Sequence, residues 1–234
     1  MASGDSEAIK VYSILLPLYI IGILLALSLH ETAHGWVAYK CGDPTAHNLG
    51  RLTLNPINHI DPIGFICMLV AGFGWAKPVP VYSRNLRNPR RDMALVSLAG
   101  PLSNILAALF FMIIYRIAYI PLAMMALEAE TAFAINIITA AIMFLQIIVD
   151  INITLAVFNL LPVPPLDGSK ILYSFLPPKL YFKIMPYERY ISLALMLLLV
   201  FGVLSPVISA VSGFIFSRMF TGVDFVISLI EGLF

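Results

Sequence analysis

The sequence predicts an all-α polytopic membrane protein with about five or six transmembrane helices and a re-entrant or short β element near a functional site. Composition is the first reason: of 234 residues, 60% are hydrophobic and only 12% are charged, far from the average of a soluble domain. Five long apolar stretches are the second, and the uneven distribution of basic residues between them is the third. We expect one integral-membrane domain over residues 1–234, with a core at 11–175 and a C-terminal helical segment at 190–234. The net charge of +1 gives no reason to expect a nucleic acid partner.

The first apolar stretch runs from about Val11 to Leu29, and we expect its helix to continue through His34 towards Tyr39. The residues before it hold two acidic side chains against Lys10, so the positive n-region of a signal peptide is missing. The stretch is also longer than a signal-peptide core. We therefore interpret it as a retained membrane helix.

Four further stretches follow along the chain. Residues 60–75 form a short one, 93–123 and 131–161 form two long ones, and the last begins at 191. Gly202 and Pro206 interrupt this last stretch, so it is either one kinked helix or two helices, and the proline favours two.

The charges of the connections predict the orientation. Cytoplasmic connections of membrane proteins are enriched in Lys and Arg. The connection between 93–123 and 131–161 has only acidic charges, whereas basic residues flank both sides of 60–75 and follow the fourth stretch; they are Lys40, Arg51, Lys77, Arg84, Arg87, Arg90 and Arg91, then Lys170, Lys179, Lys183 and Arg189. We therefore expect a multi-pass protein of the plasma membrane, in contact with the lipid bilayer, in which residues 60–75 re-enter from the cytoplasmic side without crossing.

An extended segment is expected at residues 75–81. Pro78 and Pro80 exclude a helix there but are compatible with an edge strand. Residues 51–54 alternate in the same way and are the candidate partner strand. The alternative is an irregular connector.

The pattern His30-Glu31-Thr32-Ala33-His34 lies at the end of the first apolar stretch. On a helix, this HExxH pattern places two imidazoles on one face, where both can bind one zinc ion, and the adjacent Glu can act as general base. Titratable side chains at membrane depth are costly and usually functional. The alternative is a pair of polar residues at a helix end near the lipid headgroups.

Asp167 is the candidate for a third ligand, because a catalytic zinc site usually has three protein ligands and one open position. If residues 60–75 do not cross the membrane, Asp167 reaches the same face as His30 and His34. If they cross, it cannot. Taken alone, Asp167-Gly168 after a proline cluster would indicate an ordinary turn.

Together these motifs resemble the site-2 protease family of intramembrane zinc metalloproteases. Three motifs occur in the family's order: HETAH in the first span, Ala99-Gly100-Pro101-Leu102-Ser103-Asn104 near the start of the third, and Asn159 to Gly168, which close the fourth. The resemblance covers roughly residues 15–175. Residues 50–62 resemble the compact prokaryotic branch, and we expect neither a PDZ insert nor a CBS-domain tail.

The resemblance implies a role for each matching residue. His30, His34 and Asp167 would bind one Zn²⁺ per chain, Glu31 would be the general base, and Asn159 would help to place or polarise the substrate carbonyl. For Asn159 the alternative is a hydrogen bond to a helix carbonyl near the prolines. The roles of three further polar residues stay open: Asn104, His47 and His59.

The sequence therefore favours an intramembrane zinc metalloendopeptidase that cleaves a transmembrane segment of a protein substrate near its cytoplasmic side, as in regulated intramembrane proteolysis. One alternative is a membrane metal-ion transporter or sensor that uses the same His/Asp site. Such a protein would show polar or acidic residues along several spans. The spans here are nearly free of charged residues, and the exceptions are Arg116, Asp150 and Arg218. The other is a catalytically silent relative that only binds membrane partners.

Overall fold

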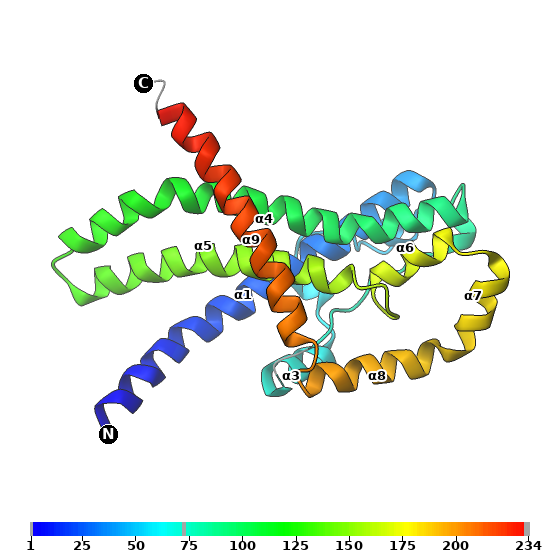
Figure 1. Cartoon of the computed structure of the whole chain (residues 1–234), viewed down its shortest axis with the longest axis horizontal. Helices are drawn as coiled ribbons and strands as arrows, with labels where there is room; N and C mark the ends of the chain where they lie inside the picture. Colours follow the sequence, from blue (N-terminus) through cyan, green and yellow to red (C-terminus); the bar gives the residue numbers. More distant parts are fainter. Residues whose placement is uncertain (1, 72–73, 232–234) are drawn as a thin grey trace.

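The computed structural model describes residues 2–71 and 74–231, and its elements within these ranges are helices (Figure 1). Nine of them are α-helical: α1 (Ala2–Cys41), α2 (Thr45–Asn48), α3 (Pro62–Ala71), α4 (Pro89–Glu128), α5 (Ala132–Asn159), α6 (Asp167–Phe175), α7 (Pro178–Ile184), α8 (Glu188–Val200) and α9 (Ser205–Glu231). Three short 3₁₀ turns complete the order: η1 (Pro56–His59), η2 (Ser83–Asn85) and η3 (Met185–Tyr187).

Four helices in the described residues are long and apolar enough to cross a membrane. These segments are Leu15–Cys41 in α1, Pro89–Glu128 in α4, Ala132–Asn159 in α5 and Ser205–Ile230 in α9. An all-α membrane protein is therefore confirmed, whereas a fifth or sixth span is not. The ten residues of α3 measure about 15 Å, half of the roughly 30 Å hydrocarbon core.

The C-terminal apolar stretch divides into two helices. The break falls at Gly202, whose φ of +68° is a left-handed conformation that a residue with a side chain rarely adopts. α8, before the break, has 13 residues and is too short for a span, while α9 has 27. The expected interruption is confirmed, although only α9 is a candidate span.

α4 and α5 form a long antiparallel hairpin that α1 and α9 cross (Figure 1). Apolar side chains fill the interface of α4, α5 and α9; the buried cluster is Ala108, Met112, Val149, Ile153, Val157 and Val223. An ion pair also joins two of these helices, because Arg116 Nε on α4 lies 2.5 Å from Asp224 Oδ1 on α9. Polar groups in contact with lipid are costly, so this pairing stabilises the position of α9.

The expected strand pair between residues 51–54 and 75–81 is not formed. The described residues contain no strand, and one isolated antiparallel bridge joins Ile60 to Ala76. Pro78 and Pro80 lack the N–H groups that a ladder needs. Instead, the Arg51 side chain donates to the Lys77 carbonyl oxygen at 2.8 Å.

Candidate metal centre

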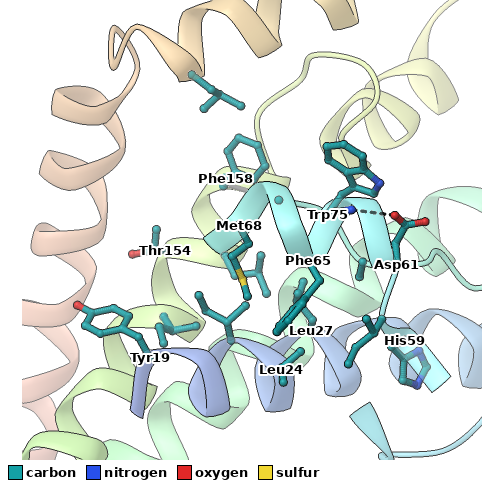
Figure 2. A pocket seen from close by; sticks show the side chains of 18 of the residues that line it. Tyr19, Leu24, Leu27, His59, Asp61, Phe65, Met68, Trp75, Thr154 and Phe158 are labelled. Carbon is teal, nitrogen blue, oxygen red and sulfur yellow. Dashed lines mark hydrogen bonds between the residues drawn. The ribbon is translucent and has the colours of Figure 1, made fainter. Parts of the chain in front are cut away.

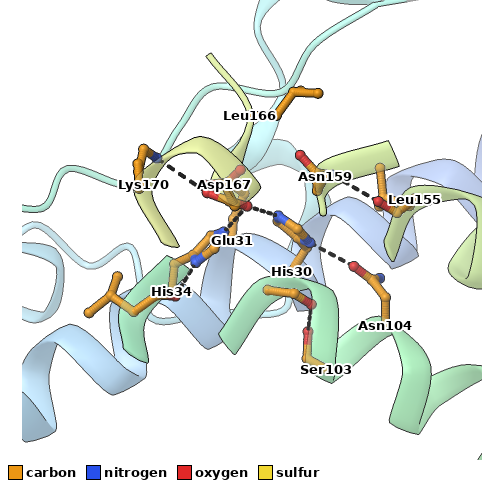
Figure 3. A network of polar contacts seen from close by, with 12 residues as sticks. His30, Glu31, His34, Ser103, Asn104, Leu155, Asn159, Leu166, Asp167 and Lys170 are labelled. Carbon is orange, nitrogen blue, oxygen red and sulfur yellow. Dashed lines mark hydrogen bonds and ion pairs between the residues drawn. The ribbon is translucent and has the colours of Figure 1, made fainter. Parts of the chain in front are cut away.

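The two histidines of the HExxH pattern lie one turn apart near the C-terminal end of α1, and the surrounding helices fix both rings. His34 Nδ1 donates to the backbone carbonyl of Val96 on α4 at 2.6 Å. His30 Nδ1 contacts Asn104 Oδ1, also on α4, at 2.6 Å (Figure 3). With both protons on Nδ1, each Nε2 carries a lone pair, which is the arrangement that a metal-binding histidine requires.

Asp167 completes the group from the first turn of α6. Its Oδ2 lies 3.1 Å from His30 Nε2 and 3.0 Å from His34 Nε2. The three residues are buried, with exposed fractions of 3%, 8% and 6%. Gly168 allows this approach, since a Cβ there would lie 2.3 Å from the Leu160 carbonyl oxygen.

The donor set fits a metal cation. Two imidazole lone pairs and a carboxylate oxygen converge, with all ligand atoms within 4.8 Å of one another. Such lone pairs repel one another unless a cation lies among them. Two nitrogens and one oxygen with a further open position are the ligands of catalytic zinc. His30, His34 and Asp167 are thus brought together as the sequence predicted.

Lys170 adds a positive charge beside the group. Its Nζ lies 3.2 Å from Asp167 Oδ1, the carboxylate oxygen that faces away from the histidines. The two oxygens of one carboxylate therefore have separate partners, and the ammonium group holds the plane of the carboxylate. From the sequence, Lys170 was expected only as one of the cytoplasmic basic residues, although its position one helical turn after Asp167 was a usable signal of its place at the site.

Glu31 lies beside the group, and the extended segment holds it. The Val79 N–H donates to Glu31 Oε2 at 2.7 Å. Val79 stands between Pro78 and Pro80, which have no backbone N–H, so Val79 supplies the backbone donor of this stretch. Glu31, the three candidate ligands and Val79 line one cavity of about 820 Å³.

A buried carboxylate anchors the far end of the extended segment. Asp43 follows α1 and is fully buried; it accepts hydrogen bonds from Tyr82 N at 2.7 Å and Asn85 Nδ2 at 2.9 Å, and also from Thr45. Burial acts to raise the pKa of the Asp43 carboxyl, but these hydrogen bonds outweigh it and hold the pKa below its usual value. None of the sequence motifs indicated this role for Asp43.

Asn104 has a role that the sequence left open. It is fully buried, and its Nδ2 donates to Asn152 Oδ1 at 2.8 Å and to the Ala26 carbonyl oxygen at 3.2 Å. Asn152 in turn donates to the carbonyl of Ile148 at 2.7 Å. These bonds fix Asn104 so that its oxygen faces His30, and they link α1, α4 and α5 at the level of the site.

The other candidate residues lie further from the convergent group. Asn159 lines the cavity, and its Nδ2 donates to the Leu155 carbonyl at 3.0 Å, so its catalytic role stays a prediction. His59 is buried and contacts the Thr53 carbonyl at 2.8 Å. His47 stacks on Tyr39. The structure brings neither histidine into the metal-binding group of the described residues.

Gly100 leaves the space in which the two histidine rings sit. A Cβ at this position would lie 2.5 Å from His34 Nε2 and 2.6 Å from His30 Nε2, closer than real Cβ contacts. The glycine of the Ala99-Gly100-Pro101 sequence therefore permits α4 to pack directly against the metal-facing nitrogens. A residue with a side chain at position 100 would clash with the histidine rings, which explains the glycine in this motif.

Comparisons with known proteins agree with this geometry. "Putative zinc metalloprotease YwhC" of Bacillus subtilis is 44% identical to this chain, in an alignment that covers 75% of this chain and 77% of the relative. A second, "Putative zinc metalloprotease Rip2" of Mycolicibacterium smegmatis, is 32% identical over 78% of this chain and 66% of its own. No solved structure matches the chain. The sequence model of the family described as "Peptidase family M50" matches residues 18–204 of this chain. The chain therefore belongs to peptidase family M50, the site-2 protease family of intramembrane zinc metalloproteases.

Proposed function

We propose that this protein is a zinc-dependent intramembrane endopeptidase that hydrolyses a peptide bond in a transmembrane segment of a membrane protein, near its cytoplasmic side. One observation carries the proposal. The buried groups His30 Nε2, His34 Nε2 and Asp167 Oδ2 converge at a cavity that Glu31 also lines. The names of the relatives and the family membership support the same activity.

Each residue of the site has a chemical task. His30, His34 and Asp167 would hold zinc, which polarises a carbonyl and makes water more acidic. Glu31 accepts a proton from the attacking water and returns it to the leaving amine. Asn159 would orient the scissile carbonyl with its amide. The Val79 N–H, 2.7 Å from Glu31 Oε2, sets the direction of the carboxylate.

The substrate would lie along the extended segment. A transmembrane helix hides its peptide bonds, so it must unwind before cleavage, and an unwound strand can pair with exposed backbone. Because Glu31 already engages the N–H of Val79, pairing would use the backbone carbonyls of residues 78–80 and the N–H of Val81. The cavity lies open along this segment, between Pro78, Val79 and Val81 on one wall and the metal-binding group on the other.

The topology is part of the proposal. α3 would re-enter from the cytoplasmic side, so that residues 40–59 and 77–92 share that side with the metal centre. The short length of α3 and the Ile60–Ala76 bridge, which returns the chain beside its starting point, support this arrangement. Both connections are rich in basic residues, which supports their position on the cytoplasmic side of the plasma membrane.

Reconstitution tests the function. The purified protein in proteoliposomes, loaded with zinc, is incubated with a single-span model substrate, and the products are identified by mass spectrometry. Cleavage within the span, abolished by a chelator and restored by zinc, is the expected result. Zinc flux across the vesicle membrane without cleavage would instead support the transporter.

A further inference from the structure

A second cavity, of about 600 Å³, lies between α1, α3, α5 and the start of α9, and its lining residues on α1 precede His30 in the chain. Its wall is largely apolar, and Leu24, Leu27, Phe65, Met68 and Phe158 face it in Figure 2. Two carboxylates are among the polar residues of the lining, and one of them, Asp61, accepts a hydrogen bond from Gly64 N at 2.8 Å. Asp150 on α5 is only partly exposed, and within the described residues its carboxylate has no hydrogen-bonding or ion-pair partner.

Three walls of this cavity continue into the metal centre. On α1, Leu24 and Leu27 lie on the same helical stripe as Glu31, at i, i+3 and i+7. On α5, Leu155 lines this cavity and Asn159, one turn later, lines the next. The extended segment passes from Trp75, which lines this cavity, to Val79, which lines the cavity of the metal centre. A chain lying in the cavity is therefore aimed at Glu31.

Residue spacing along α5 and α1 indicates how far Asp150 lies from the site. Asp150 precedes Asn159 by nine residues, which is about 14 Å along a helix. On α1, Gly22 precedes Glu31 by the same nine residues, and a Cβ on Gly22 would lie 2.8 Å from Ile151 Cδ1. Both helices thus place Asp150 about 14 Å from the site, towards the opposite membrane face.

We propose that this cavity binds the part of the substrate's transmembrane segment that remains embedded, and that Asp150 selects segments with a hydrogen-bond donor, an amine or an amide, at its level. The inference rests on the proposed function and specifies its substrate class. Charge complementarity supports it: an unpaired acidic side chain in an apolar wall is costly, and a donor on the occupant would offset that cost. Thr154, one turn along α5 from Asp150, adds a hydroxyl on the same stripe.

The geometry also predicts where the donor stands in the substrate. If that part of the substrate stays helical, 14 Å corresponds to about nine residues from the scissile bond. If it is extended, the same distance corresponds to about four residues. The donor lies on the side of the bond that leads to the opposite membrane face.

The test scans one Lys or Asn through the span of an otherwise Leu/Ala model substrate. The enzyme forms are the unmodified protein, Asp150→Asn and Asp150→Leu, all zinc-loaded in proteoliposomes. The donor should raise cleavage by the unmodified protein roughly three-fold, and at most about eighteen-fold, at about position four or nine. These factors correspond to the average and the largest energies measured for hydrogen bonds within a membrane protein. Asp150→Leu should lose this preference, while Asp150→Asn keeps it for Asn and loses it for Lys.

Two controls separate this inference from the proposed function. Every form should cleave the donor-free substrate, which shows that the variants fold. In parallel, the same substrates with a photo-crosslinker are bound to Glu31→Gln, alone and combined with Asp150→Leu, so binding is measured without cleavage. Position-independent donor effects, or equal preferences with and without Asp150, overturn the inference while leaving the protease intact. Donor-selective crosslinking without any cleavage would leave the cavity assigned and remove the protease.

Discussion

Replacing Asn104 by Leu should release His30 and lower the affinity for zinc. The side chain is fully buried, and its oxygen lies 2.6 Å from His30 Nδ1. The Leu side chain would leave the imidazole N–H and the Asn152 amide oxygen without partners in the interior. Loss of such an outer partner typically weakens metal binding by about 10- to 100-fold, or about 1.4–2.8 kcal/mol.

The assay measures zinc retained by the purified protein across a series of competing chelator concentrations. Asn104→Asp keeps an acceptor for His30, so we expect its zinc affinity to stay near that of the unmodified protein, although a buried charge beside Asn152 lowers its stability. Asn136→Leu, an exposed asparagine on α5, is the matched control. Zinc affinity within about twofold of the parent for Asn104→Leu would refute the positioning role.

Three further outcomes follow from particular contacts. Gly100→Ala should displace the histidine rings and reduce bound zinc several-fold, because its Cβ would lie within 2.6 Å of both metal-facing nitrogens, whereas Gly213→Ala, with nothing within 4 Å, should leave zinc unchanged on elemental analysis. Asp43→Asn should slow cleavage with zinc retained. Because hydrogen bonds lower the pKa of this carboxyl, its contribution to stability is present above the ordinary Asp range and is lost as the pH falls through the folded-state pKa. The melting temperature of the variant should therefore depend less on acid pH than that of the parent. Arg116→Leu should loosen α9 and lower the melting temperature, and the double variant with Asp224→Leu should recover part of that loss; equal melting of single and double variants would argue against the ion pair.

Local patterns explain why the sequence could predict the centre of the site. His30 and His34 are four residues apart on one helix, so their shared face follows from helical periodicity alone. Asp167 required one further step, the number of membrane crossings, which the loop charges supplied. The four long apolar helices were visible for the same reason, since a span is set by length and composition.

The parts that escaped prediction depend on contacts between distant residues. Asn104 and Asn152 are separated by 48 residues, and their bond exists only because α4 packs on α5. The Glu31–Val79 bond, likewise across 48 residues, depends on where the extended segment passes. The strand pairing was wrong because alternation indicates an extended chain but does not identify its partner, and the prolines at 78 and 80 removed the donors of a ladder.

The proposed function assigns metal ligation and proton transfer to different residues of one cavity. The most direct measurement compares bound zinc and substrate cleavage in Glu31→Gln and Asp167→Ala, purified side by side with the unmodified protein. Glu31→Gln should retain about one zinc per chain and cleave nothing, because the amide keeps the shape but cannot accept the proton. Asp167→Ala should lose most of its zinc together with cleavage. Full zinc content in Asp167→Ala, or undiminished cleavage by Glu31→Gln, would contradict the account.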